Sequence, residues 1–344
     1  MQIVLLLAVP VRRLAAQQRD SYKSLVHNMH KILFIFFAFV LSRCVIQAQQ
    51  VQYPYPQQRF AVHLEGKDSY MSYMDVHPAN ETGKVIILFH GKNFNGYYFK
   101  DVIPLLVQKG YRVIVPDLPG WGRSGKPNLH YSFHMLAAVN KSLLDSLNIK
   151  KVSVFGHSMG GMLAIRFVLM YPSFVEKLAL ENPIGLEDYK TFVPYQSLEK
   201  LYHKEKSATY DSYKKYQQGY YPVWKAEYEQ YVAAQAAALS DPAFDSIAWV
   251  NAVTYQMIYE QTVVYELTDI SVPVLLIIGQ ADRTVVGKDL LTDEQKNKYG
   301  QYPQLGRKAA AAIKNAQLVE LEGVGHIPHV QTLDRFSTAL LGFL

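Results

Sequence analysis

The stretch Lys151–Gly161, KVSVFGHSMGG, decides the fold of this chain. Val152–Phe155 is mostly β-branched and aromatic, which predicts a buried strand that Gly156 ends. The mainly apolar residues after Ser158 continue to about Tyr171 and predict a helix. Ser158 therefore lies in a strand-to-helix turn, inside the pattern G-x-S-x-G.

Two glycines make such a turn feasible. The turn has to lift the serine oxygen clear of the sheet, and side chains two residues to either side would collide, which Gly156 and Gly160 avoid. The backbone N–H of Met159, at the start of the helix, can then face a negatively charged oxygen. The bare pattern is a weak signal, and its position between a strand and a helix gives it weight.

Composition and charge limit the class of protein to which this chain can belong. The chain has 344 residues, of which 49% are hydrophobic and 19% charged, which is typical of a globular protein with a large core. The formal net charge is +6, but the basic excess lies in residues 1–48 and the remainder is nearly neutral. The charge therefore gives no argument for a nucleic-acid partner.

The sequence predicts no metal and no cofactor. The single cysteine is Cys44, so residues 49–344 have no disulfide, no thiolate metal site and no cysteine nucleophile. The histidines lack a ligand spacing such as H-E-x-x-H, and no phosphate-binding Gly-Lys-[Ser/Thr] loop occurs. The partner that remains is a small-molecule substrate, and the sequence leaves the oligomeric state open.

Residues 1–48 have the features of a secretory signal. The apolar run Ile32–Leu41 follows Lys31, and Ala48 is a small residue at the expected cleavage position. The run is too short to span a membrane, which takes about 20 residues. We predict cleavage after Ala48 and a secreted or periplasmic protein with no stable membrane span after processing.

Two details of this segment leave alternatives. Met29 directly precedes the signal, which indicates that translation starts there and that residues 1–28 are an over-extended reading of the gene. The alternative is an uncleaved anchor that uses both apolar runs. A lipid-attached Cys44 is disfavoured because the preceding Arg43 is bulky.

After the signal, strands and helices alternate. Strands are predicted at 60–64, 70–76, 84–90, 112–116, 152–155, 175–180, 272–278 and 317–321, and helices at 99–109, 133–148, 158–171, around 306–314 and at 327–343. The first two strands form an antiparallel pair. We predict an α/β fold with a mostly parallel eight-stranded sheet flanked by helices.

One long segment interrupts the alternation. Residues 185–268 are rich in tyrosine, contain no convincing buried strand, and show helical patterns at 226–239 and 247–259. They predict an inserted helical cap. The other predicted parts are a linker at 49–58 and a core made of residues 59–184 and 269–344.

Two further strand ends supply partners for the serine. A serine hydroxyl is a poor nucleophile near pH 7 and needs an adjacent base that a carboxylate orients. Asp282 follows the predicted strand at 272–278, and His326 follows the strand at 317–321. Strands of a parallel sheet present such residues at their carboxyl ends, and the order Ser158, Asp282, His326 is that of the α/β hydrolases.

Four motifs resemble the cap-bearing branch of the α/β-hydrolase superfamily from about Phe60 to Leu344. They are His90-Gly91, the turn Asp117-Leu-Pro-Gly-Trp-Gly-Arg-Ser124, the serine turn and Gly325-His326. The resemblance implies that the residue after His90-Gly91 supplies a second N–H to the oxyanion, so that Lys92 joins Met159. Lys92-Asn93-Phe94-Asn95 departs from the usual small or aromatic residues, which makes Asn93 the reserve donor.

Each assignment has a rival. Glu181 or Glu187 could replace Asp282 as the acid, and His329 could replace His326 as the base. The motif residues His90, His157 and Asp117 are interpreted as structural neighbours, and most cap tyrosines as packing residues. The charged loop 288–298 is interpreted as solvated.

These residues predict a serine hydrolase. The serine nucleophile disfavours dehalogenases and epoxide hydrolases of this fold, which use aspartate there, and the loop after His90 does not match proline-releasing peptidases. We expect hydrolysis of a carboxylic ester or similar acyl compound through an acyl-enzyme. The alternatives are cleavage of an amide or a carbon–carbon bond by the same residues, or a non-catalytic binding protein.

Overall fold

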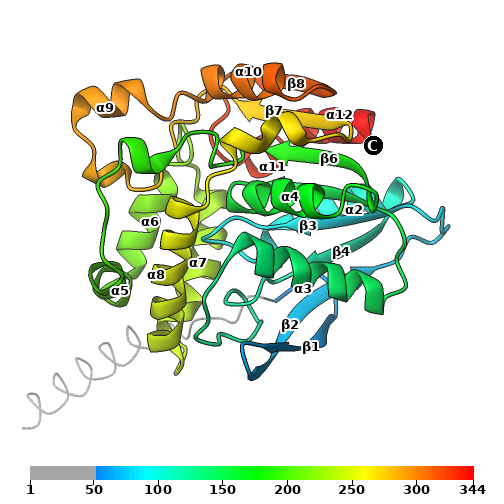
Figure 1. The fold of residues 1–344 in the computed structure, drawn as a ribbon, viewed down its shortest axis with the longest axis horizontal. Helices are drawn as coiled ribbons and strands as arrows, with labels where there is room; N and C mark the ends of the chain where they lie inside the picture. Colours follow the sequence, from blue (N-terminus) through cyan, green and yellow to red (C-terminus); the bar gives the residue numbers. More distant parts are fainter. Residues whose placement is uncertain (1–51) are drawn as a thin grey trace, which may run out of the picture. The chain divides into compact units, whose positions relative to one another are not determined.

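A computed structural model describes residues 52–344, and the predicted signal lies outside them. Eight strands in this part form one sheet in the order β1-β2-β4-β3-β5-β6-β7-β8 (Figure 1). They are β1 (Gln57–Leu64), β2 (Lys67–Val76), β3 (Val85–Phe89), β4 (Arg112–Pro116), β5 (Val152–His157), β6 (Val175–Glu181), β7 (Val274–Gly279) and β8 (Ala316–Leu321). Only the pairs β1–β2 and β2–β4 are antiparallel. The predicted mostly parallel, eight-stranded sheet is confirmed.

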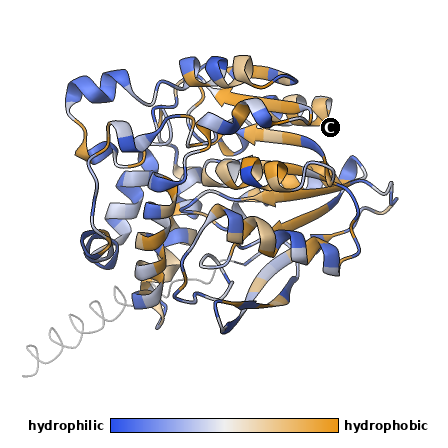
Figure 2. Ribbon diagram, viewed as in Figure 1, coloured by the Kyte–Doolittle hydropathy of each residue, from blue (hydrophilic) through white to orange (hydrophobic). Residues whose placement is uncertain are grey.

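Helices cover both faces of the sheet. The α-helices are α2 (Val102–Gln108), α3 (Phe133–Ser146), α4 (Met159–Met170), α5 (Leu198–Lys206), α6 (Tyr210–Gln218), α7 (Glu229–Ala236), α8 (Phe244–Glu260), α9 (Asp293–Lys298), α10 (Tyr302–Ala312), α11 (Pro328–Gln331) and α12 (Leu333–Phe343). Helices α3, α4 and α10 pack on one face, and α2 and α12 on the other. The inner strands and α4 are hydrophobic, whereas α9 is hydrophilic (Figure 2). Two apolar cores therefore enclose the sheet.

Short 3₁₀ turns account for the main differences from the predicted elements. They are η1 (Gly96–Phe99), η2 (Tyr189–Thr191), η3 (Ala226–Tyr228), η4 (Ala237–Ser240), η5 (Val264–Asp269) and η6 (Lys288–Leu290). The helix predicted at 99–109 begins only at Val102, because Pro104 has no N–H and is tolerated only in a first turn. The helix predicted at 226–239 is divided into three parts, which are η3, the short α-helix α7 and η4.

Two further predictions differ from the structure, one at a break within a helix and one at the start of a strand. The helix predicted at 327–343 is broken at Thr332, whose backbone φ of −151° is not helical. Strand β1 begins at Gln57, inside the predicted linker, because Gln58 pairs with Tyr73 of β2 and accepts a hydrogen bond from its hydroxyl at 2.9 Å.

The chain between β6 and β7 contains helices α5 to α8 and no strand. These helices lie beyond the carboxyl ends of the parallel strands (Figure 1), as an inserted cap would. Among residues 52–344 no helix is both long and apolar enough to cross a membrane.

Candidate active site

Ser158 lies at a strained turn between β5 and α4. Its backbone φ is +56° and its ψ is −120°, values that cost a residue with a side chain free energy. A Cβ on Gly156 would lie 2.3 Å from the carbonyl oxygen of Gly160, and one on Gly160 would lie 2.1 Å from that of Phe89. Glycine is therefore required at both positions, as the motif predicts.

The structure brings Ser158, His326 and Asp282 together, although they are far apart in sequence. The Nε2 of His326 lies 3.0 Å from the serine Oγ, and its Nδ1 lies 2.7 Å from Oδ2 of Asp282. A carboxylate only accepts, so Nδ1 carries the hydrogen and Nε2 is free to accept from the serine hydroxyl. The three side chains are almost fully buried. This arrangement can activate the serine as a nucleophile.

The Asp282 carboxylate is held in its charged form. Burial favours the neutral acid, but the attraction of His326 and hydrogen bonds from His326 and Thr284 outweigh it and lower the pKa of Asp282. The backbone N–H of Thr284 donates to Oδ1 at 2.8 Å. Asn182 Nδ2 donates to Oδ2 at 2.7 Å. Both oxygens of this buried carboxylate therefore accept hydrogen bonds that fix its orientation.

Of the predicted oxyanion donors, Met159 directly follows Ser158 in the chain and Lys92 lines the same pocket as Ser158. Met159 is the first residue of α4, where a backbone N–H has no acceptor within the helix. The Trp121 indole donates to the Lys92 carbonyl oxygen at 2.5 Å. A Cβ on Gly91 would lie 3.1 Å from the serine Cβ. The loop therefore runs close to the nucleophile, and the Lys92 carbonyl oxygen is bound to the Trp121 indole.

The reserve donor, Asn93, has another partner. Its Nδ2 donates to the hydroxyl of Tyr220, in the cap, at 2.9 Å. Tyr220 also contacts the base, because its ring stacks on that of His326 at 4.9 Å and its carbonyl oxygen accepts the His326 N–H at 2.8 Å. A Cβ on Gly325 would lie 2.1 Å from that carbonyl oxygen. The cap thus contacts both the base and the oxyanion loop.

The rivals for the acid and the base are paired with each other. Glu181, at the end of β6, accepts the backbone N–H of His329 at 2.6 Å and lies 2.7 Å from its Nδ1. Both side chains are buried. Glu187 accepts the N–H of Gly300 at 2.9 Å, and burial raises its pKa. Among the described hydrogen bonds, the side chains of these three residues bind His329, Glu181 and Gly300, and not the Ser158 hydroxyl.

A chain of hydrogen bonds links Gly91, in the loop that carries Lys92, to the backbone of His326. Gly91 N–H donates to the Tyr98 hydroxyl at 2.9 Å, and that hydroxyl lies 3.0 Å from Nδ1 of His157. The Nε2 of His157 lies 2.9 Å from the His326 carbonyl oxygen, which only accepts, so the imidazole donates there. Its Nδ1 then accepts from Tyr98. His157 is a neighbour of the site with a structural role.

The other motif residues also support the loops. His90 Nδ1 lies 2.9 Å from the Gly91 carbonyl oxygen, and its Nε2 accepts the Leu118 N–H at 3.0 Å. The buried Asp117 accepts the N–H groups of Gly96 and Arg123, both at 2.7 Å. These contacts fit the scaffolding roles predicted for both residues.

A pocket of about 270 Å³ opens at Ser158 beneath the cap. Four tyrosines line it, namely Tyr213, Tyr216, Tyr220 and Tyr255. Its charged groups are paired across elements, Lys92 with Glu205 at 3.2 Å and Lys204 with Asp289 at 2.6 Å. The pocket can therefore take an uncharged group more easily than an ion.

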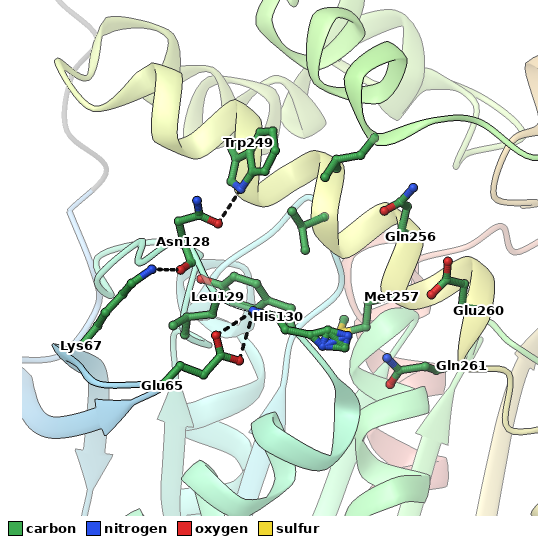
Figure 3. A pocket seen from close by; sticks show the side chains of 13 residues that line it. Glu65, Lys67, Asn128, Leu129, His130, Trp249, Gln256, Met257, Glu260 and Gln261 are labelled. Carbon is green, nitrogen blue, oxygen red and sulfur yellow. Dashed lines mark hydrogen bonds between the residues drawn. The ribbon is translucent and has the colours of Figure 1, made fainter.

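A second cavity of about 400 Å³ lies between α8 and the start of the sheet (Figure 3). The Trp249 indole donates to Oδ1 of Asn128 at 2.7 Å, and Glu65 accepts the His130 N–H at 3.2 Å. Lys67 donates to the Asn128 carbonyl. The Trp249–Asn128 bond joins α8 of the cap to the core, and the other two bonds lie within the core. The cavity contains none of the predicted site residues. Within residues 52–344, no group of three or more His, Cys, Asp or Glu side chains could hold a metal ion.

Sequence reasoning missed Asn182 and Tyr220. Asn182 directly follows a buried strand, at the sheet edge where Asp282 and His326 also emerge, and that position is a signal that could have found it. Tyr220 is one of many cap tyrosines, and no sequence pattern separates it from the others.

Comparisons with known proteins fit this geometry. Residues 84–204 match the model of the alpha/beta hydrolase fold family. The structure is similar to the crystal structure of a probable hydrolytic enzyme from Pseudomonas aeruginosa PAO1, with 42% sequence identity and a TM-score of 0.84. That match covers 85% of this chain and 95% of the other.

Curated relatives match over shorter segments. A haloalkane dehalogenase from Psychrobacter cryohalolentis is 34% identical over 142 residues, 39% of this chain and 47% of the relative. A 2-hydroxy-6-oxononadienedioate/2-hydroxy-6-oxononatrienedioate hydrolase from Escherichia coli K12 is 37% identical over 123 residues, 35% of this chain and 42% of the relative. The chain spans less than half the length of each of these two relatives.

Proposed function

This chain belongs to the α/β hydrolase fold family, and on that premise we propose that it is a serine hydrolase that cleaves a carboxylic ester or a related acyl compound. The observation that carries the proposal is the His326 ring, which bridges Ser158 at 3.0 Å and Asp282 at 2.7 Å. A hydroxyl, an imidazole and a carboxylate in this order form the arrangement that acyl transfer requires.

The reaction proceeds in two halves. Ser158 Oγ attacks the acyl carbon while Nε2 of His326 takes its proton, and Asp282 orients the imidazole and stabilises its charge. The N–H groups of Met159 and Lys92 hold the oxyanion. His326 then protonates the departing alcohol, which leaves an ester on Ser158. Water, deprotonated by His326, attacks that ester and releases the acid.

The pocket supports an uncharged, apolar or aromatic acyl or alcohol group. Its tyrosine rings offer apolar surface, and its four charged lining groups neutralise each other in two ion pairs. An anionic acyl group would meet no unpaired cation among the described lining residues and would lose hydration without compensation. The Escherichia coli relative is named for a dioate, which carries two carboxylates, so its substrate does not fit this pocket as well.

Dehalogenation is disfavoured by the nucleophile. Dehalogenases of this fold use a carboxylate at the turn, where this chain has Ser158. Cleavage of an amide or a carbon–carbon bond remains the second candidate, because the same three side chains could perform it and one relative is a hydrolase of an oxo-dioate.

The first test is removal of the nucleophile. Ser158→Ala is expected to lower kcat for p-nitrophenyl esters by several orders of magnitude, because the attacking group is lost. Ser337→Ala, a change at a half-buried side chain of α12 that does not line the pocket, is the matched control and should leave kcat unchanged. A fluorophosphonate probe should label the wild type and the control but not Ser158→Ala. An unchanged rate in Ser158→Ala contradicts the proposed mechanism.

A substrate panel separates the candidate reactions. We expect p-nitrophenyl butyrate and benzoate to be hydrolysed faster than a p-nitrophenyl ester with a carboxylate on its acyl chain, and all three faster than the matching anilides. Preferential cleavage of a carbon–carbon bond in an oxo-acid would favour the second candidate. Absence of both turnover and probe labelling would indicate a binding protein.

We also propose that the protein is exported. The support is the apolar run Ile32–Leu41 followed by the cleavage position Ala48, both outside the described residues. Secreted material should begin at Gln49, and a mature chain that retains Phe36 would contradict this.

A further inference from the structure

Asn182, directly after β6, shares a carboxylate oxygen with the base. Its Nδ2 donates to Oδ2 of Asp282 at 2.7 Å, and the Nδ1 of His326 lies 2.7 Å from the same atom. The amide cannot be turned over, because its Oδ1 accepts the backbone N–H of Gly279 at 3.0 Å, and an N–H can only donate. Asn182 is fully buried, so its bond to the carboxylate is shielded from bulk solvent.

The backbone around Asn182 is held in an unfavourable conformation. Its φ of +38° is in the left-handed region, which asparagine tolerates better than most residues. Its N–H donates to the Ile277 carbonyl oxygen at 3.0 Å, and the carbonyl oxygen of the preceding Glu181 accepts the Ser158 N–H at 3.1 Å. A buried residue keeps such a conformation only where its surroundings determine it.

We propose that Asn182 is a positioning residue whose amide fixes the Asp282 carboxylate in the orientation that presents Oδ2 to His326. This inference rests on the proposed hydrolase function. The pair Glu181-Asn182 then touches all three parts of the site. Its backbone holds Ser158, the Asn182 amide holds Asp282, and the Glu181 carboxylate holds His329 on the segment that carries His326.

Asn182 also affects the charge balance of the site. An amide N–H presents the positive end of its dipole to the carboxylate and competes with the imidazole for Oδ2. Its removal should strengthen the attraction between Asp282 and a protonated His326. The acid limb of the kcat/KM profile, where the base takes up a proton, should therefore move to higher pH.

Substitution of Asn182 leaves the other titratable and polar groups around His326 and Asp282 unchanged. The groups that face the His326 ring are Ser158, Asp282, His157, Tyr220 and Tyr302. Around Asp282, besides His326 and Asn182, Thr284 donates a hydrogen bond to the carboxylate, and the carboxylate charge favours the protonated forms of Tyr189, Tyr220, Lys288 and Tyr302. A shift of the acid limb in Asn182→Gly therefore reports the loss of the amide, and any further shift in Asn182→Asp reports the added carboxylate.

Two substitutions and a matched control test the role. Asn182→Gly permits the positive φ but removes the amide, and Asn182→Asp places an acceptor where the donor was. We expect kcat to fall about tenfold for Asn182→Gly and about 100-fold or more for Asn182→Asp, with KM changed less than about threefold. The acid limb should move upward in both and further in Asn182→Asp. Asn148 also has a positive φ of +57° but is exposed, so Asn148→Gly and Asn148→Asp should change neither quantity.

The outcomes distinguish this inference from the proposed function. A wild type that neither turns over p-nitrophenyl esters nor reacts with a fluorophosphonate refutes the function. An active wild type whose Asn182→Asp variant keeps its kcat and acid limb overturns the role of Asn182. If Asn182→Asp does not fold, Asn182→Gly decides on the same two quantities. A fall in kcat that follows lost thermal stability, with an unmoved acid limb, shows a merely structural residue and also overturns the proposal.

Discussion

At the scale of single residues, two helical glycines should respond to alanine in opposite ways. A Cβ on Gly160 would lie 2.1 Å from the Phe89 carbonyl oxygen, which is backbone and cannot yield, whereas one on Gly342 would meet nothing within 4 Å. Gly160→Ala should lower the free energy of unfolding by about 3 kcal/mol or more. Gly342→Ala should raise it by about 0.5 kcal/mol, because the unfolded chain loses freedom. Urea unfolding of both variants measures this, and equal stability of the two would contradict the close approach.

The residues of the site differ in how well the sequence reveals them. Ser158, Asp282 and His326 each follow a recognisable strand or motif, and the structure places all three in contact. Asn182 was not predicted, because its importance depends on Gly279 fixing its amide, which is a contact between distant parts of the chain. Tyr220 has no distinguishing pattern, since a stacking partner is chosen by the fold and not by local sequence.

At the scale of elements, the contact between the cap and the oxyanion loop should influence turnover. Tyr220→Phe removes the hydroxyl that accepts from Asn93 but keeps the ring on His326. The loss of one hydrogen bond should lower kcat about fivefold, with a smaller change in KM. Kinetics with a p-nitrophenyl ester measure this effect.

Two further variants make that measurement specific. Asn93→Ala should cost about as much as Tyr220→Phe, and the double variant should cost no more than either, because all three lose the same bond. The control is Tyr210→Phe, which removes a hydroxyl that donates to Glu229 in the cap and should leave kcat unchanged. Fully additive losses would show that the two residues act independently.

The elements themselves were largely predictable from sequence. Buried strands such as β3 and β7 are continuous apolar runs, and their existence and order were predicted correctly. Their helices were less accurate at the ends, since Pro104 delays α2 and Thr332 breaks the last helix. These limits are set by individual backbone conformations, which periodicity does not encode.

At the scale of the whole molecule, two buried histidines should make stability depend on pH. Burial lowers the pKa of His90, and burial together with the nearby His326 and His329 lowers that of His157 well below 6.5. Below about pH 6.5 the unfolded chain takes up protons that these native imidazoles do not. The native state therefore loses up to about 1.4 kcal/mol per pH unit for each group as the pH falls, and keeps its full stability above that pH.

Urea unfolding at pH 7, 6 and 5 measures this dependence. His157→Gln should show a shallower loss of unfolding free energy between pH 7 and 5 than the wild type, although its stability at pH 7 is lower. Asn148→Gly, a change at an exposed side chain that does not titrate, should keep the wild-type slope. An identical slope in His157→Gln would show that this imidazole does not contribute.

The carbonyl oxygen of Tyr220 limits how the helical segment between β6 and β7 can be exchanged for that of another protein. A chimaera that receives the corresponding helices of another family member would lose the acceptor for the His326 N–H unless the transplanted segment rebuilds that bend. A working chimaera should keep residues 219–221 unchanged, with both fusion points outside them. Gly325 should remain glycine because a Cβ there would collide with the Tyr220 carbonyl oxygen. Substrate selectivity can then be redesigned at the tyrosines that line the pocket without displacing His326.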